Sequence, residues 1–185
     1  KRRLPPRVKH PLTVPAAPNA VWALDFMQDR LYAGRAFRTL NVLDEGVREA
    51  LEIAIDTSLP GERVVRVLTQ LTASRGKPAG LRCDDGPELI SKVLEDWCAE
   101  NDVELRHIQP GKPNQNAYIE RFNRTYREEV LSAYLFEDLD QVREITWSWM
   151  REYNEERPHD ALGKVPPAVY REALEAGKST FRRST

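Results

Sequence analysis

The chain has 185 residues, of which 41% are hydrophobic and 31% are charged, and its formal net charge is -1. This places it in the ordinary globular range, as one domain of typical size with a real core. Because the net charge is close to zero, it gives no argument for nucleic-acid binding, and such a function must depend on where the charges lie.

The number of cysteines and the lengths of the apolar runs exclude further classes of protein. Cys83 and Cys98 are too few for a disulfide framework, and no Cys/His spacing resembles a zinc site. No apolar run approaches the roughly 18 residues of a membrane span, and no signal peptide is visible. We therefore expect a soluble, intracellular chain with no membrane partner. Because it begins with Lys1 rather than Met, we expect a fragment of a longer protein.

The first half of the chain predicts an arm followed by three strands. Residues 1–18 hold five prolines among several Lys and Arg, which indicates a basic, extended arm or linker. Residues 21–27 are apolar on both alternating sides, so they predict a central strand that is covered on both faces. Residues 38–43 and 50–55 predict two further strands. Together the three strands suggest an antiparallel meander.

Helices and strands alternate in the second half. A helix is predicted from residue 60 to about 76, followed by a strand at 80–83. Asp85 and Glu88 fit a capping box before a second helix, whose expected inner face holds Leu89, Val93 and Trp97. A fifth strand is predicted at 103–108, followed by helices at 118–131 and 139–153. We expect an α/β catalytic core over residues 19–160 and a C-terminal extension over 161–185.

Three acidic residues occupy positions where an ordinary fold would place something else. Asp25 interrupts the apolar run VWALDFM, Asp84 ends a strand in LRCDDGPE, and Glu120 lies on a basic helix in NAYIERFN. Two like charges about 4 Å apart cost on the order of 4 kcal/mol at an effective dielectric near 20. A bound divalent cation would reverse the sign of that interaction.

Each acid also has an ordinary structural interpretation. Asp25 fits a strand-end carboxylate bonded to a loop, and Glu120 fits a salt-bridged helix surface. Either Asp84 or Asp85 could serve the site while the other caps the next helix; the capping-box spacing assigns the cap to Asp85. On the Glu120 helix, an apolar stripe runs beside a polar group formed by Glu120, Asn123, Arg124 and Arg127.

Several segments together resemble the catalytic core of bacterial insertion-sequence transposases of the OrfB type, in the retroviral-integrase superfamily. They lie within residues 19–170 in the family's order, and 35 residues separate Asp84 from Glu120, the spacing typical of this acid-triad group. The matching segments are WALDF, FRTLNVLDE, REALEIAID, RCDDGPE, HIQPGKPNQNAYIERFNRTYREEVL and YNEERPHDAL.

The resemblance implies a ribonuclease H-like fold with a five-stranded mixed sheet flanked by helices. It also implies that Asp25, Asp84 and Glu120 form the catalytic, metal-binding triad of a polynucleotidyl transferase. Hard oxygen ligands of this kind suit Mg²⁺, with Mn²⁺ as a substitute and two ions per site when DNA is bound. The expected reaction is nicking of DNA at element ends, followed by transfer of the 3′-hydroxyl to a target phosphodiester.

The resemblance also implies a DNA-contacting surface and partners. The family pattern has Asn where this chain has Asp85, which adds negative charge beside the site. We expect DNA, both element ends and target, as the partner, at least a dimer on DNA, and a place in the bacterial cytoplasm with the nucleoid. The expected DNA contacts are Lys112, Gln115, Asn116, Arg121, Asn123, Arg124 and Arg127.

Two other functions share much of this pattern. A hydrolytic nuclease on the same fold would use the same acids and metal ions without joining DNA strands. A non-catalytic DNA-binding or assembly module could keep the fold, although three retained acids argue against it. The sequence separates these alternatives only weakly.

Overall fold

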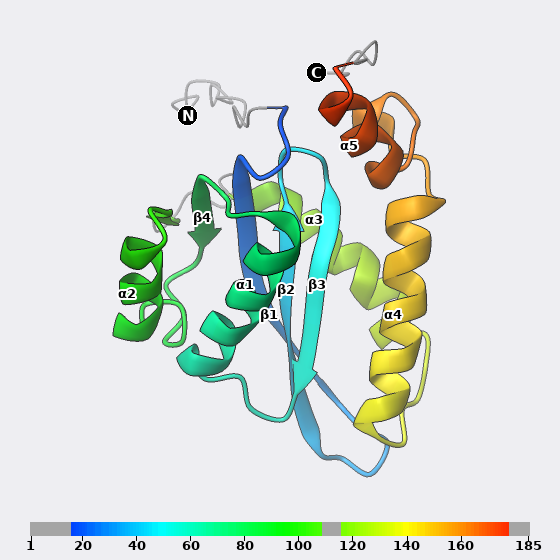
Figure 1. The fold of residues 1–185 in the computed structure, drawn as a ribbon. Coiled ribbons are helices and arrows are strands. Elements are labelled where there is room, and N and C mark those ends of the chain that lie inside the picture. The colour runs from blue at the N-terminus through cyan, green and yellow to red at the C-terminus, as the bar shows by residue number, and fades with distance from the viewer. Residues whose placement is uncertain (1–15, 109–115, 178–185) are drawn as a thin grey trace, which may run out of the picture.

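The computed structural model describes residues 16–108 and 116–177, which form a sheet with helices on both faces (Figure 1). The helices are α1 (Gly61–Arg75), α2 (Lys92–Glu100), α3 (Ala117–Tyr126), α4 (Leu139–Glu155) and α5 (Pro167–Glu175). The strands are β1 (Val21–Arg30), β2 (Ala36–Asp44), β3 (Glu49–Asp56), β4 (Gly80–Cys83) and β5 (Glu104–His107).

The five strands form one mixed sheet in the order β3-β2-β1-β4-β5. The pairs β1–β2 and β2–β3 are antiparallel, so the predicted meander is confirmed. β4 joins β1 in parallel, and β5 joins β4 in parallel. This order makes β1 the central strand. The predicted ribonuclease H-like α/β class, with its five-stranded mixed sheet, is confirmed.

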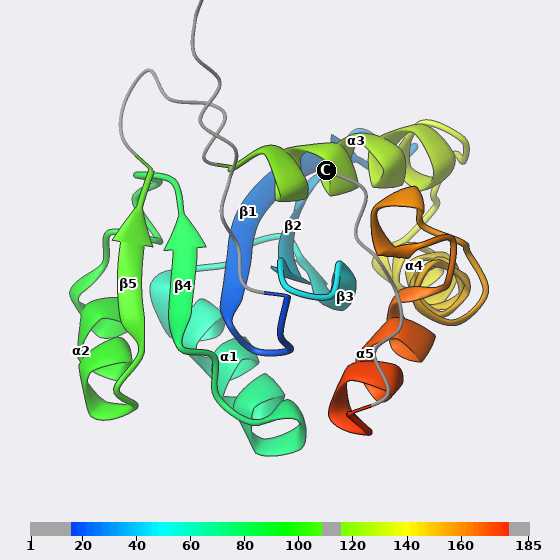
Figure 2. The same ribbon diagram turned by 90° about the horizontal axis from the view of Figure 1, so that it is seen from above.

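Figure 2 shows from above that α1 and α2 lie on one face of the sheet and α3 and α4 on the other, and an apolar core fills each side. Trp22 and Leu24 of β1 pack with α1 and α2 on one face, whereas Ala23 packs with α3 and α4 on the other. All three side chains are completely buried. The apolar pattern on both sides of β1 is therefore explained, because successive side chains of a strand point to opposite faces.

The second predicted helix begins later than the sequence suggested. α2 starts after Ser91, whose hydroxyl accepts from the backbone N–H of Leu94, so the capping box at Asp85 and Glu88 is wrong. A turn precedes the helix, and it carries Leu89 into the core while Glu88 pairs with Arg38. Val93, expected on the inner face, is 38% exposed. The inner face consists instead of Leu94, Trp97 and Cys98.

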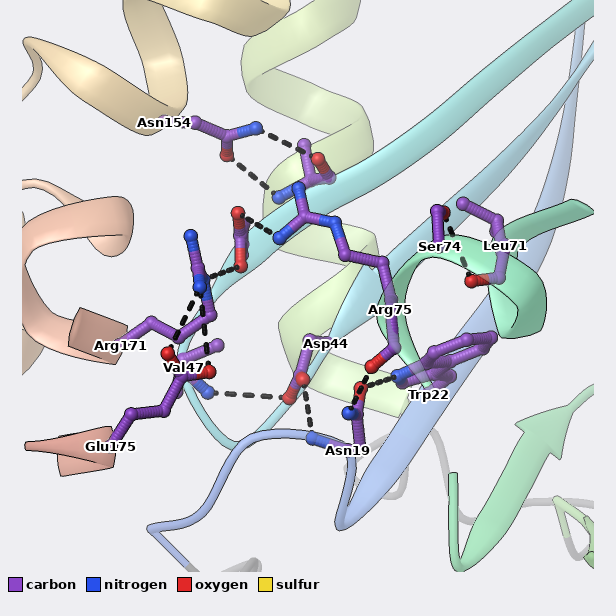
Figure 3. A network of polar contacts seen from close by, with 12 residues as sticks. Asn19, Trp22, Asp44, Val47, Leu71, Ser74, Arg75, Asn154, Arg171 and Glu175 are labelled. Atoms are coloured by element: carbon purple, nitrogen blue, oxygen red, sulfur yellow. Dashed lines mark hydrogen bonds and ion pairs between the residues drawn. The ribbon is translucent and has the colours of Figure 1, made fainter. Parts of the chain in front are cut away.

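The turn between β2 and β3 is held by buried acids (Figure 3). The Asp44 carboxylate accepts from the backbone N–H groups of Asn19, Gly46 and Val47 at 2.7, 2.8 and 3.3 Å. Glu49 forms ion pairs with Arg75 of α1 at 2.7 Å and with Arg171 of α5 at 3.0 Å. These contacts connect the N-terminal segment, α1 and α5 to one end of the central sheet.

The segment after α4 also packs against the domain. A short 3-10 turn, η3 (Asp160–Leu162), leads into α5, and Leu162 and Tyr170 form a small buried cluster with Val47. Among the helices of residues 16–108 and 116–177, none is long and apolar enough to cross a membrane.

The predicted helix at 118–131 consists of α3 followed by one π-helical turn, η2 (Arg127–Leu131). The expected apolar stripe is confirmed, since Ile119, Phe122, Tyr126 and Val130 are all buried. Tyr126 is joined to Thr146 of α4 by a hydroxyl–hydroxyl hydrogen bond of 2.7 Å. This bond fixes α3 against α4 within the apolar layer.

Replacing Tyr126 with Phe should lower the free energy of unfolding by about 1 kcal/mol, because the buried Thr146 hydroxyl loses its partner. Tyr134→Phe is the matched control, since Tyr134 is 50% exposed and its change should stay within about 0.5 kcal/mol. Urea unfolding followed by circular dichroism measures both. Equal stabilities for the two variants would contradict this role of the buried hydroxyl.

Candidate functional site

Asp25 and Asp84 are brought to neighbouring positions by the parallel pairing of β1 and β4. The paired residues Val21 and Gly80 differ by 59 positions, as do Ala23 and Arg82. Asp25 and Asp84 have the same offset of 59 and lie two residues beyond Ala23 and Arg82, where the strand pairing ends. Adjacent strands lie about 4.8 Å apart. The two carboxylates therefore leave the sheet side by side, at the end where β4 stops.

Glu120 is added to these acids by helix α3, which packs across β1 and β2. Glu120 is exposed, one residue along from the buried Ile119 and three residues before Asn123. The Asn123 side-chain amide donates to the Asp25 carboxylate at 2.7 Å. Because Glu120 and Asn123 are neighbours on one helix face, this bond holds the Glu120 side of α3 close to Asp25.

The electrostatics of Asp25 show that the three carboxylates interact. Burial raises the pKa of Asp25 to about 6, the backbone N–H of Phe26 opposes the shift, and the charges of Asp84 and Glu120 raise the pKa further. The Asn123 amide acts in the opposite direction by stabilising the ionised form. Two carboxylates from other elements are thus close enough to disfavour the charge on Asp25.

The carboxylates converge without forming a closed ligand cage. Within residues 16–108 and 116–177, no group of three His, Cys, Asp or Glu side chains is arranged to hold a metal ion. The donors themselves are carboxylate oxygens that repel one another, and a hard divalent cation relieves such repulsion. In the chemistry of its oxygen donors, although not in their present spacing, the set fits Mg²⁺.

A chain of buried polar side chains supports Asp25 from beneath. Asn41 lies opposite Asp25 on β2, and its side-chain N–H₂ group donates to the side-chain oxygen Oδ1 of Asn123 at 2.7 Å. The Thr39 hydroxyl donates to Oδ1 of Asn41 at 2.9 Å. Thr39 and Asn41 are completely buried, and Asn123 is 8% exposed. The bond from Asn41 fixes which way the Asn123 amide faces, so its N–H₂ group points at Asp25.

Sequence reasoning missed Thr39 and Asn41. A signal was present, because both polar residues lie between Phe37 and Leu43 on the same face of β2, and that face is otherwise apolar there. That alternation gives the face but not the partner, which lies 82 residues away along the chain.

The loop after β4 separates the roles of the two neighbouring aspartates. The Asp84 carboxylate accepts from the backbone N–H of Gly86 at 3.1 Å and acts on Asp25. Asp85 turns toward β5, where its carboxylate lies 3.4 Å from Nδ1 of His107. The position that differs from the expected family pattern is therefore directed at His107 rather than at Asp25.

The expected DNA-contact residues fall into three groups. Lys112 and Gln115 lie outside the described residues. Asn116 and Asn123 are buried, and Arg127 donates to the Asp29 carboxylate at 3.0 Å and to the Gln28 carbonyl at 2.7 Å. Arg121 and Arg124 are exposed on α3. Only these last two have exposed side chains among the described members of the set.

Comparison with known proteins agrees with this arrangement. Two family models, each described as an integrase core domain, match residues 15–113 and 101–167. A protein of insertion element IS407 from Burkholderia multivorans is 42% identical over 159 residues, covering 86% of this chain and 57% of the relative. An IS476 protein from Xanthomonas euvesicatoria is 39% identical over 170 residues, covering 92% of this chain and 49% of the relative.

Solved structures share the fold at low sequence identity. The simian T-cell lymphotropic virus intasome matches with a TM-score of 0.72 at 15% identity, covering 86% of this chain and 56% of that chain. The HTLV-2 integrase catalytic core domain in complex with magnesium matches with a TM-score of 0.68 at 15% identity, over 85% and 99% of the two chains. The chain spans about half the length of the curated relatives it matches. It belongs to the integrase core domain family.

Proposed function

We propose that this chain cuts DNA at the ends of a mobile element and joins the freed 3′-hydroxyl to a target phosphodiester, with Asp25, Asp84 and Glu120 as its catalytic acids. The observation that carries the proposal is the convergence of Asp84 and Glu120 on Asp25, whose pKa they raise. Such mutual repulsion is unfavourable for a purely structural site, and it is what a divalent cation would relieve.

The residues present fit Mg²⁺, and Asp25, Asp84 and Glu120 would hold it, with Mn²⁺ as a substitute. When bound, paired ions of this kind supply charge stabilisation for the attacking and leaving oxygens of a phosphodiester. A magnesium complex of the structurally similar HTLV-2 integrase core supports this choice of ion. The Asn123 amide donates to one Asp25 oxygen and the Phe26 backbone N–H donates to the other, which orients the carboxylate and leaves each oxygen a further lone pair for a ligand.

The proposed reaction has two in-line displacements. Water first attacks phosphorus at the element end, the P–O3′ bond breaks, and a free 3′-hydroxyl remains. That hydroxyl then attacks a target phosphorus, and a new P–O bond forms as a target P–O3′ bond breaks. Arg121 and Arg124, exposed on α3 beside Glu120, would position the DNA backbone together with Lys112 and Gln115.

We also propose that the chain works as at least a dimer on DNA, since two element ends are joined together. Trp147 on α4 is 64% exposed beside a groove between α1, β3 and α4. Structures of the HTLV-2 integrase core include dimeric and trimeric forms. An exposed Trp beside the edge strand β3 supports this face as the contact with a second copy.

Glu120→Gln should lower Mg²⁺-dependent cleavage of an element-end duplex by on the order of 100-fold or more, because a charged ligand is lost. DNA affinity should change little. Glu128→Gln, an exposed glutamate on the following π-helical turn, is the matched control and should keep its activity. A gel assay with a pre-nicked end then scores strand transfer. Unchanged cleavage by Glu120→Gln would refute the assigned triad, and cleavage without joining would indicate a nuclease.

Asn123→Ala should weaken Mg²⁺ binding by about 10- to 100-fold, because Asp25 loses the amide that orients it. The pKa of Asp25 should rise further, since the amide stabilises the ionised carboxylate. The Mg²⁺ dependence of cleavage and its pH profile measure both effects. Gln70→Ala, an exposed amide on α1, serves as the control. If Asn123→Ala keeps the wild-type Mg²⁺ dependence, Asn123 does not position Asp25.

Mg²⁺ should raise the melting temperature at pH 7.5 and lose this effect at pH 5. The raised pKa of Asp25 means that its ionisation reduces stability as the pH rises through about 6, and a bound cation offsets that loss. Each 1 kcal/mol of binding should add about 2–4 °C for a domain of this size. Thermal unfolding of the wild type and of Asp25→Asn measures the effect. An equal Mg²⁺ shift in Asp25→Asn would place the ion elsewhere.

A further inference from the structure

A second concave site lies on the side of α3 away from Glu120. It has a volume of about 250 Å³ and is formed by α3, the end of α4 and the turn that follows α4. The residues from Arg157 to His159, which belong to the matching segment YNEERPHDAL, form one wall. The polar and aromatic residues that line it include Arg48, Tyr118, Arg121, Tyr153, Arg157 and His159.

Three guanidinium groups act on this pocket from different parts of the chain. Burial lowers the pKa of His159, and the charges of Arg157, Arg121 and Arg48 lower it further, against a bond to the Tyr153 carbonyl. Burial raises the pKa of Tyr153 to about 12, and the same three arginines oppose that shift. The charges of the same three arginines therefore act on the pKa of both His159 and Tyr153.

The three arginines are not equivalent. Both terminal nitrogens of Arg157 donate hydrogen bonds to the Glu129 carboxylate, at 2.9 and 2.5 Å, so the charge of Glu129 largely balances that of Arg157. Arg48 stacks over the Tyr118 ring, 3.4 Å from its centroid, and has the left-handed φ of 60°, which is uncommon for a residue with a side chain. Arg121 is exposed. Asp160 also lines the pocket, and the charge of Glu45 acts on Arg48, so the positive charges at the pocket are partly offset by acids.

We propose that this pocket binds one backbone phosphate of a DNA duplex, through Arg48 and Arg121. The proposal deepens the proposed function, because it adds an anchoring point for the same substrate. Guanidinium groups match phosphate oxygens by paired hydrogen bonds and stay charged at any working pH. Arg121 directly follows Glu120 on α3, about 100° around the helix, so DNA lying across α3 can reach both the acids and this pocket.

The test measures DNA affinity as a function of salt, in EDTA so that no cleavage occurs. The variants are Arg48→Gln, Arg121→Gln and their combination, and Arg66→Gln, an exposed arginine on the opposite face of the sheet, is the control. Losing one phosphate contact should reduce the slope of log affinity against log salt by about 1. The double variant should bind about 5- to 10-fold more weakly, which is a loss on the order of 1 kcal/mol.

A second measurement uses the unmodified protein. NMR titration of His159 should show a higher pKa when an element-end duplex is bound, because a phosphate beside the imidazole favours its charged form. Inorganic phosphate is the parallel probe. Suppose that millimolar phosphate raises the pKa of His159, while the duplex neither raises it nor displaces the phosphate. That result would assign the site to free phosphate and overturn the DNA proposal.

If the double variant keeps the wild-type salt slope and DNA leaves the pKa of His159 unchanged, the proposal is overturned. A change of oligomeric state without a change of slope would assign the pocket to a second copy of the chain and would overturn it too. The proposed catalysis is judged separately. If the wild type lacks Mg²⁺-dependent cleavage while the slope still falls in the double variant, the pocket stands and the catalytic assignment fails.

Discussion

The candidate site depends on the cost of ionising the partly buried Asp25, which burial sets first and the charges of Asp84 and Glu120 increase. Asp25 ionises inside a partly buried site where Asp84 and Glu120 disfavour its charge. An isolated group of this kind would destabilise the fold or take up a proton. The chain accommodates it by placing hydrogen-bond donors against Asp25, the Phe26 N–H at 2.8 Å and the Asn123 amide at 2.7 Å. These hydrogen bonds offset part of the cost of ionising Asp25.

The two apolar cores give this site its rigidity. β1 is buried on both faces, so Asp25 is carried by the least mobile part of the sheet, while Asp84 begins a loop at the edge of the same sheet. Glu120 comes from a helix that is anchored by a buried stripe and by the Tyr126–Thr146 bond. One acid thus belongs to a strand, one to a loop and one to a helix. Small movements of the loop or helix can change their separation without disturbing the core.

Helix α3 connects the site to the rest of the molecule. One of its faces packs on the sheet, a second carries Glu120 and Asn123 toward Asp25, and a third borders the arginine-lined pocket. Arg127 fixes its far end to β1 through Asp29 and the Gln28 carbonyl. A substrate that spans the helix would therefore contact groups whose relative positions are already set, which reduces the entropy lost on binding.

The sequence by itself determined the element order, the meander, the burial of β1 and the identity of the three acids as candidates, because these depend on local periodicity and on motifs within short segments. It misplaced the start of α2, since a capping pattern at Asp85 and Glu88 competes with a turn that buries Leu89 and pairs Glu88 with the distant Arg38. Only the tertiary structure decided that Asp85 turns toward His107, that Asn41 and Asn123 support the site, and that Arg48 meets Arg121 and Arg157 around one pocket. These are contacts between side chains far apart in the chain, and their partners are selected by strand register and helix packing, which no local pattern encodes.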